Sequence, residues 1–307
     1  MNIAETVAII GAGPAGIAAA LQLQRYKIKF KIFEQGDIGG LLLNANRVEN
    51  YPGFPGGITG PALVKNFRQQ LSDQEIKVDQ HEVKQVDYKA EKKHFIIKTD
   101  QSFISSKFLI IASGTKSREL PALSPDLEHS NYIFYEVYPL KTCKGKTIAV
   151  IGAGDGAFDY ALNLAQKENK VRIFNRSNTC KCLSLLYDQV KNNSMISYYP
   201  HCSLQSIKEN HSGLTLSFKH QKKLPSFEVD RLLIAIGRDP ALDFLSENLK
   251  LRKNILIKQK VLYFIGDVHN GLYRQTGIAV GEGIKAAMMI FDTLMENNED
   301  FINSGPG

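Results

Sequence analysis

Hydrophobic residues along the chain recur with the periods of strands and helices in alternation. An uninterrupted apolar run at Val7–Ile10 is followed by a glycine-rich turn and by the helical pattern Ile17–Leu23. Lys27–Glu34 then alternates polar and apolar positions, which is the period of a strand. The order strand, turn, helix, strand predicts a nucleotide-binding unit at the start of the chain.

The same order recurs in the middle of the sequence. A strand is expected at Thr147–Ile151, followed by a second glycine-rich turn, a helix at Phe158–Gln166 and a strand at Lys170–Asn175. This internal duplication of the unit predicts two bound nucleotides.

Two further glycine turns, Ala112–Thr115 and Gly237–Pro240, mark the places where the chain passes from one domain to the other. We therefore expect an α/β protein of two Rossmann-like, three-layer domains, with the second inserted into the first. Residues 1–115 and 242–307 form the first domain and residues 116–241 the second. Additional strands are expected at Glu82–Tyr88, Lys93–Thr99, Phe108–Ala112, Ser203–Ile207, Leu214–Phe218, Arg231–Ile236 and Val261–Ile265, with a final helix from Thr276 to about Glu296.

Composition supports two globular domains in a reducing compartment. The 307 residues are 43% hydrophobic and 22% charged, with four cysteines and no tryptophan. The N-terminus lacks a secretion pattern, so a cytoplasmic protein is expected. The net charge of +7 is scattered, which indicates a solvated surface or a face for an acidic protein partner, and no nucleic acid. Glycines interrupt the uncharged stretch Thr6–Gln24, so no membrane association is expected.

The first glycine motif has the residue types that a dinucleotide requires. Gly11 permits a tight turn, Gly13 lets the backbone approach a pyrophosphate, and Gly16 allows close packing of helix on strand. Glu34 ends the second strand, where a carboxylate can accept hydrogen bonds from ribose hydroxyls. Pro14 and Ala15 begin the helix, whose N–H groups favour phosphate.

The second motif consists of Gly152, Gly154, Asp155, Gly156 and Ala157, with alanine at the third glycine position. Asn175 occupies the place where an acid would select NADH, and Arg176 follows it. A 2′-phosphate is therefore tolerated or favoured, and NADPH is preferred to NADH as the expected co-substrate.

The order of these parts resembles the low-molecular-weight thioredoxin reductase superfamily, a class of pyridine nucleotide-disulfide oxidoreductases. Gly39-Gly-Leu41, Val48–Gly53, Ile111–Thr115, Gly266–Val268 and Tyr273–Gln275 are similar to its further segments. The resemblance implies FAD at the first motif, NAD(P)H at the second, and a homodimer. It assigns to FAD the residues Gly39, Gly40, Leu41, Asn50, Val83, Ala112, Gly114, Gly266, Asp267, Arg274, Gln275 and Thr276, and to NAD(P)H the residue Gly237.

One segment departs from that family. Its redox CxxC would fall at Tyr135-Glu-Val-Tyr138 in this chain. Phenols cannot replace thiols, because only a thiolate attacks a disulfide. Tyr135 and Tyr138 either line the flavin or fill the space of the missing thiols. The string Tyr135-x-Val137-x-x-Leu140 is instead similar to ferredoxin-NADP reductases of this fold, which implies a ferredoxin or flavodoxin acceptor.

The four cysteines allow an alternative redox site in place of the missing CxxC. Cys180 and Cys182 form a CxC pair shortly after Arg176, while Cys143 and Cys202 stand apart. They are ordinary thiols used as small hydrophobic residues, or Cys180 and Cys182 are an alternative redox pair with an easily reduced disulfide. No metal site is expected from this spacing.

The sequence thus favours an FAD-dependent NAD(P)H oxidoreductase that passes electrons to a small redox protein such as ferredoxin, flavodoxin or a thioredoxin-like protein. One alternative is a disulfide reductase that works through Cys180 and Cys182. The other is a flavoprotein without turnover that serves as a redox sensor or binding subunit. Because the resembling enzymes rotate one domain to bring nicotinamide to flavin, Gly114 and Gly237 are expected to act as hinges.

Overall fold

The computed structural model describes residues 5–121, 125–127, 129–219 and 225–303, and these residues form two units. The first unit contains residues up to Leu43, then Val48–Thr115 and the chain from Pro240. The second contains Asn44–Arg47 and Lys116–Asp239. The chain passes between them in two short strands that pair with each other, β7 (Thr115–Ser117) and β16 (Arg238–Pro240).

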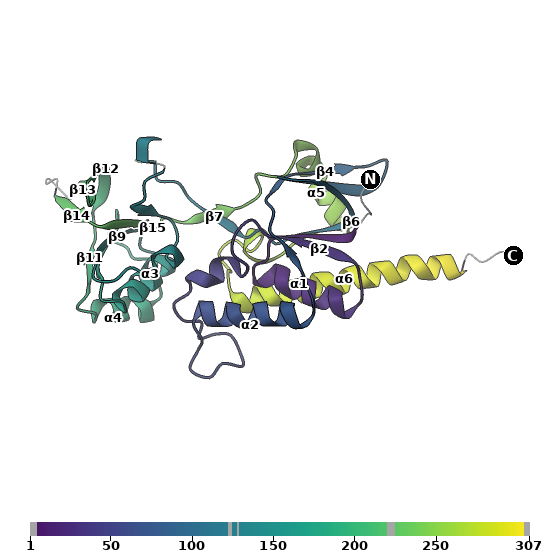
Figure 1. Cartoon of the computed structure of the whole chain (residues 1–307), viewed down its shortest axis with the longest axis horizontal. Coiled ribbons are helices and arrows are strands. Elements are labelled where there is room, and N and C mark those ends of the chain that lie inside the picture. Colours follow the sequence, from purple (N-terminus) through teal and green to yellow (C-terminus); the bar gives the residue numbers. More distant parts are fainter. Residues whose placement is uncertain (1–4, 122–124, 128, 220–224, 304–307) are drawn as a thin grey trace. The chain divides into compact units, whose positions relative to one another are not determined.

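The first unit is built on a seven-stranded sheet in the order β3-β2-β1-β6-β5-β4, with β17 paired to β6. Strands β3, β2, β1, β6 and β17 are parallel, whereas β4, β5 and β6 are antiparallel. Helices α1, α2 and α6 gather on one side of this sheet, and α5 lies on the other (Figure 1). The strands are β1 (Glu5–Ile10), β2 (Phe30–Phe33), β3 (Val78–Asp79), β4 (Val83–Lys89), β5 (His94–Thr99), β6 (Phe103–Ile111) and β17 (Leu262–Phe264).

Helices α1 and α6 of this unit pack at very short range. A Cβ atom on Gly283 of α6 would lie 2.2 Å from the Ala15 carbonyl oxygen of α1, so only glycine allows this approach. On the other face, the β-strands pack against Leu249 and Leu256 of α5. The helices are α1 (Pro14–Arg25), α2 (Gly60–Asp73), α5 (Glu247–Lys258) and α6 (Thr276–Asn303), with short 3₁₀ turns η1 (Gly40–Asn44) and η4 (Gly266–Val268).

The second unit has a five-stranded parallel sheet in the order β11-β10-β9-β15-β8. One core cluster joins its strands to α3 and α4, and another joins them to the antiparallel sheet β12-β13-β14. The strands are β8 (Ile133–Phe134), β9 (Thr147–Ile151), β10 (Lys170–Phe174), β11 (Ile196–Tyr199), β12 (Ser203–Asn210), β13 (Gly213–Lys219), β14 (Ser226–Val229) and β15 (Arg231–Ile234); the helices are α3 (Asp155–Ala165) and α4 (Ser184–Lys191), with 3₁₀ turns η2 (Pro125–Leu127) and η3 (Tyr138–Leu140).

The predicted α/β fold with two Rossmann-like sheets is confirmed. The expected strands are present, although several differ by a few residues at their ends. The prediction for the last helix was too short, because α6 continues past Glu296 to Asn303. Helices α2, α4 and α5 were not predicted.

Candidate functional site

The first glycine loop joins β1 to α1 and has no room for side chains at two of its glycines. Gly11 has a φ of +103°, and a Cβ atom there would lie 2.3 Å from the Ala112 carbonyl oxygen. A Cβ atom on Gly16 would lie 1.9 Å from the Gly11 carbonyl oxygen. These two glycines therefore set the turn and the close packing of α1 on β1, as the motif predicts.

Gly13 differs from its two neighbours in the motif. No atom lies within 4 Å of the place where its Cβ would stand, and its φ of −76° suits any residue. Gly13 is also the N-cap of α1, and it has no side chain to bond the first N–H groups of the helix. The space above Gly13 and the positive end of the helix fit a pyrophosphate.

Glu34 lies beside this loop, where β2 ends. One of its carboxylate oxygens accepts from the Ala12 N–H at 2.8 Å, and the other accepts from the Gly36 N–H at 2.9 Å. The acid is therefore fixed at the glycine loop by two backbone donors. A carboxylate oxygen can accept a second hydrogen bond, so Glu34 still fits the predicted contact with ribose hydroxyls.

Several other residues predicted for FAD come together around the start of α1. The Gly39 N–H donates to the Ala12 carbonyl at 2.8 Å, and a Cβ atom on Gly266 would stand 3.0 Å from the Cβ of Ala15. Elsewhere in the unit, the Asn50 amide donates to the Gln275 side chain at 2.8 Å.

Val83 and Glu282 lie on either side of the prediction for this unit, one named in it and one absent from it. Val83 packs at the start of β4 in the same hydrophobic cluster as Ile10, the last residue before the glycine loop, and its role toward FAD stays a prediction. Glu282 was missed by the sequence analysis. It accepts from the Gly266 N–H at 2.6 Å and from the Asn270 amide at 2.9 Å, and so holds the turn that contains Asp267.

The second glycine loop repeats the geometry of the first. Gly152 has a φ of +140°, and a Cβ atom there would lie 2.2 Å from the Ala235 carbonyl oxygen. The sites of a Cβ atom on Gly154 and Gly156 are open, and Gly154 is the N-cap of α3. At the third position, the methyl group of Ala157 is buried in the hydrophobic core of the unit, so alanine is accommodated there. This loop fits a second pyrophosphate.

Asn175 and Arg176 follow β10, as predicted, and the first is buried while the second is exposed. Asn175 is buried, and its amide donates to the Thr179 carbonyl at 3.1 Å and to the Tyr198 hydroxyl at 2.9 Å. Its side-chain oxygen accepts from Ser177. The Asn175 amide therefore folds the turn after β10, whereas Arg176 is exposed and available to a phosphate.

Tyr135 and Tyr138 flank a hydrogen-bond network centred on Glu136. Tyr135 is half-buried against the core of the second unit, and the Lys141 ammonium lies 4.0 Å from the centre of the Tyr138 ring. The Glu136 carboxylate pairs with Arg238 and accepts from the side chains of Asn44 at 2.8 Å, Ser117 at 3.2 Å and Tyr160 at 3.4 Å. Burial, followed by the charge of Glu136, raises the pKa of Tyr160 far above its usual value.

Cys180 and Cys182 lie side by side between β10 and α4, against the second glycine loop. Their sulfur atoms are 2.9 Å apart, and the Cys180 thiol donates to the Ala153 carbonyl at 3.4 Å. Between them, the Lys181 N–H donates to the same carbonyl at 2.9 Å. The structure therefore places the two thiols together and attaches them to the loop predicted to bind the pyridine nucleotide.

The two thiols of this pair have unequal surroundings. Burial, the hydrogen bond with Cys180, and the negative charges of Cys180 and Asp155 raise the pKa of Cys182 to about 12. Cys182 is thus protonated at neutral pH. Of the other cysteines, Cys143 is half-buried, and Cys202 is buried with a raised pKa because of that burial.

Comparison with known proteins agrees with this double site. The model of the pyridine nucleotide-disulphide oxidoreductase family matches residues 5–283. The chain belongs to this family. FAD and NADPH, the predicted cofactors, are those of the family's thioredoxin reductase branch, and the residues at both glycine loops fit them.

The relatives of this oxidoreductase chain include thioredoxin reductases. That of Streptomyces coelicolor is 30% identical over 305 residues, which cover 94% of this chain and 93% of that protein. The bifunctional thioredoxin reductase/thioredoxin of Mycobacterium leprae is 28% identical, and the chain spans 64% of its length. The structure of Lactococcus lactis thioredoxin reductase has the same fold, with a TM-score of 0.83 at 24% identity, over 95% of this chain and 99% of that one. The predicted resemblance to low-molecular-weight thioredoxin reductases is confirmed.

Within the part of the oxidoreductase that the structure describes, no helix is both long enough and apolar enough to cross a membrane.

Proposed function

We propose that this chain is an FAD-dependent NAD(P)H disulfide reductase in which Cys180 and Cys182 are the redox-active dithiol. The observation that carries the proposal is the 2.9 Å separation of their sulfur atoms. The family name and the names of the relatives support a disulfide as the acceptor. In this proposal the first unit binds FAD and the second binds NAD(P)H, each at its glycine loop.

The surroundings of the two thiols assign them different roles. Cys182 is protonated at neutral pH, so we assign the attack on the substrate to Cys180. Attack on a disulfide forms a mixed disulfide and releases one thiol. Cys182 then displaces the second thiol and closes the Cys180–Cys182 disulfide. The two electrons that restore the dithiol would be supplied by FAD bound in the first unit, which would receive them as a hydride from NAD(P)H.

The test is a comparison of two variants in the purified flavoprotein. We expect Cys180→Ser/Cys182→Ser to lose NADPH-dependent reduction of thioredoxin and of small disulfides, while NADPH still reduces the flavin at the wild-type rate. Cys143→Ser is the control, because Cys143 is a thiol of the same unit outside the pair, and it should retain both activities. A fully active double variant would exclude Cys180 and Cys182 as the dithiol.

A second candidate is the transfer of single electrons to ferredoxin or flavodoxin. The presence of Tyr135 and Tyr138 at the position of the CxxC favours it, because this route needs no thiol at that place. The same double variant separates the two functions. It would retain full ferredoxin or flavodoxin reduction if these proteins are the acceptors.

A further inference from the structure

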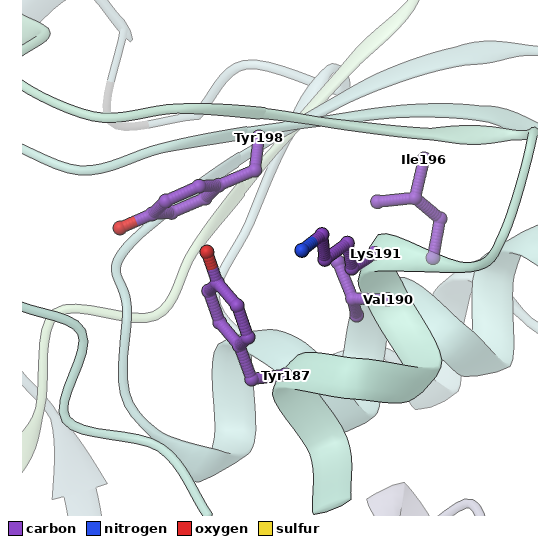
Figure 2. A pocket seen from close by; sticks show the side chains of 5 residues that line it. All are labelled: Tyr187, Val190, Lys191, Ile196 and Tyr198. Carbon is purple, nitrogen blue, oxygen red and sulfur yellow. The ribbon is translucent and has the colours of Figure 1, made fainter. Parts of the chain in front are cut away.

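A pocket of about 180 Å³ lies between α4 and β11 of the second unit. It is lined by Tyr187, Val190, Lys191, Ile196 and Tyr198, and we call it the Tyr–Lys pocket. Figure 2 shows the two tyrosine side chains on one side of the pocket, with the Lys191 ammonium directed toward the gap between their rings. Those rings meet edge to face, with 6.2 Å between their centres.

The chemistry of the Tyr–Lys pocket is that of a site for an acidic group on an apolar body. Val190 and Ile196 are buried and supply apolar walls. Among the described residues, no carboxylate forms an ion pair with Lys191, so its charge is available to a ligand. The hydroxyl groups of Tyr187 and Tyr198 can each donate a hydrogen bond to a carboxylate.

Asn175 links the pocket to the segment that carries the thiol pair. The Asn175 amide donates both to the hydroxyl of Tyr198, a pocket residue, and to the carbonyl of Thr179, the neighbour of Cys180. Tyr198 and both thiols pack against the same hydrophobic cluster, which includes Val190 and Ile196. Burial raises the pKa of Tyr198 against the opposing effect of the Asn175 hydrogen bond, and the nearby Cys180 adds a smaller upward effect.

We propose that the Tyr–Lys pocket binds the carboxylate-bearing end of a small acidic disulfide and so presents its sulfur atoms to Cys180. This assignment rests on the proposed function. A pocket of this volume holds one ring or a short chain, since cavities of about 150 Å³ accept benzene and whole drug-sized ligands need about 300 Å³ or more. The reaction converts NAD(P)H, one proton and the disulfide into NAD(P)⁺ and two thiols, through the mixed disulfide with Cys180.

Lys191→Ala tests the pocket, with Lys208→Ala as the matched control, because Lys208 is an exposed lysine on β12 of the same unit. The acidic probe is dithiobis(nitrobenzoate), and the neutral probe is hydroxyethyl disulfide. We expect Lys191→Ala to raise the KM for the acidic probe about tenfold, as for one charged hydrogen bond, without changing the KM for the neutral probe. Lys208→Ala should change neither. An equal effect of the two variants, or an equal loss with thioredoxin as substrate, would overturn the proposal.

Binding is measured separately from turnover, so that failure of the pocket can be told from failure of the proposed function. S-methyl thionitrobenzoate carries the ring and the carboxylate but has no disulfide. Calorimetry should detect its binding to the wild-type flavoprotein and about tenfold weaker binding to Lys191→Ala. Binding of this compound without reduction of any disulfide would keep the pocket and reject the reductase, whereas reduction without binding would reject the pocket alone.

Discussion

Individual glycines determine what each nucleotide loop can do. In the first loop, Gly11 and Gly16 are required because the chain itself occupies the space of a side chain, whereas the space at Gly13 is empty. The same division holds in the second loop, where Gly152 is required and Gly154 is open. The structural glycines and the ligand-facing glycine can therefore be separated by substitution.

Gly13→Ala should fold normally and lose FAD affinity, since its new methyl group meets no protein atom but occupies the place of the pyrophosphate. The free energy of unfolding of the flavin-free protein should change by less than about 1 kcal/mol. Flavin absorbance after dialysis measures the retained FAD. Gly11→Ala is the counterpart, because its Cβ would lie 2.3 Å from a carbonyl oxygen, and it should destabilise the first unit even without FAD. Full retention of FAD by Gly13→Ala would contradict the site.

Asp159 of α3 should make the stability of the second unit depend on pH. Burial raises its pKa from 3.8 to about 6, against the opposing effect of a 3.0 Å hydrogen bond from the Asn46 N–H. The folded state therefore binds the proton more tightly than the unfolded state. The stability that results is fully present below the unfolded value of 3.8 and is lost as the pH rises through about 6.

Asp159→Asn removes this charge and can still accept from Asn46. Ionising Asp159 in the folded state costs on the order of 3 kcal/mol, so the variant should be more stable than the wild type at pH 7 by up to about that amount. Urea unfolding at a series of pH values measures the difference. A variant that is no more stable than the wild type at neutral pH would show that Asp159 is not buried as described.

Among the secondary-structure elements, α1 and α6 show how a long helix is held in place. Gly281 and Gly283 both lie inside α6, but only Gly283 faces α1 at a distance that excludes a side chain. A helical glycine replaced by alanine gains about 1 kcal/mol from helix propensity alone. The two positions therefore separate propensity from packing.

Gly281→Ala should stabilise the first unit by about 1 kcal/mol. Gly283→Ala should destabilise it despite the same gain, because the new methyl group would lie 2.2 Å from the Ala15 carbonyl oxygen and force the helices apart. Thermal unfolding of the two variants side by side measures the difference. Equal stability of the two would mean that α6 does not pack on α1 at this distance.

The sequence pattern predicted the strands and α1 but not helices α2, α4 and α5. Strands β1 and β9 were predicted because their apolar runs are buried almost throughout and end at glycine turns, and the helical period of α1 follows the first of these turns. Helix α5 was missed since Leu251 and Ile255 are exposed, which blurs its helical period. Helix α4 buries only Val190. Helix α2 had a usable signal that was overlooked, with Thr59 as N-cap, Pro61 in the first turn and apolar residues at helical spacing.

The spacing of Cys180 and Cys182 in the sequence does not predict how close their sulfur atoms lie. The sequence showed Cys180 and Cys182 as a CxC pair but could not bring them together. The structure does so because Lys181 pairs with Gly154 in an isolated parallel bridge, and extended backbone turns the side chains on either side of Lys181 toward the same face. Likewise, Glu136 and Glu282 bond residues that are distant in sequence, so no local sequence pattern predicted these contacts.

At the scale of the whole molecule, each unit is expected to bind one nucleotide. FAD should stabilise only the first unit and NADPH only the second, each by about 2.7 kcal/mol at a concentration one hundred times its dissociation constant. Limited proteolysis with mass spectrometry of the cleavage sites can follow the two units separately. Protection of residues in the second unit by FAD alone would contradict this assignment.

The central claim is that the electrons reach a dithiol beyond the flavin, and counting them tests it most directly. Anaerobic titration of the oxidised flavoprotein with dithionite, with a mediator dye present, measures the electrons taken up per FAD. We expect the wild-type protein to take up four electrons, two for the flavin and two for the Cys180–Cys182 disulfide, and the Cys180→Ser/Cys182→Ser variant to take up two. Uptake of only two electrons by the wild-type protein would contradict it.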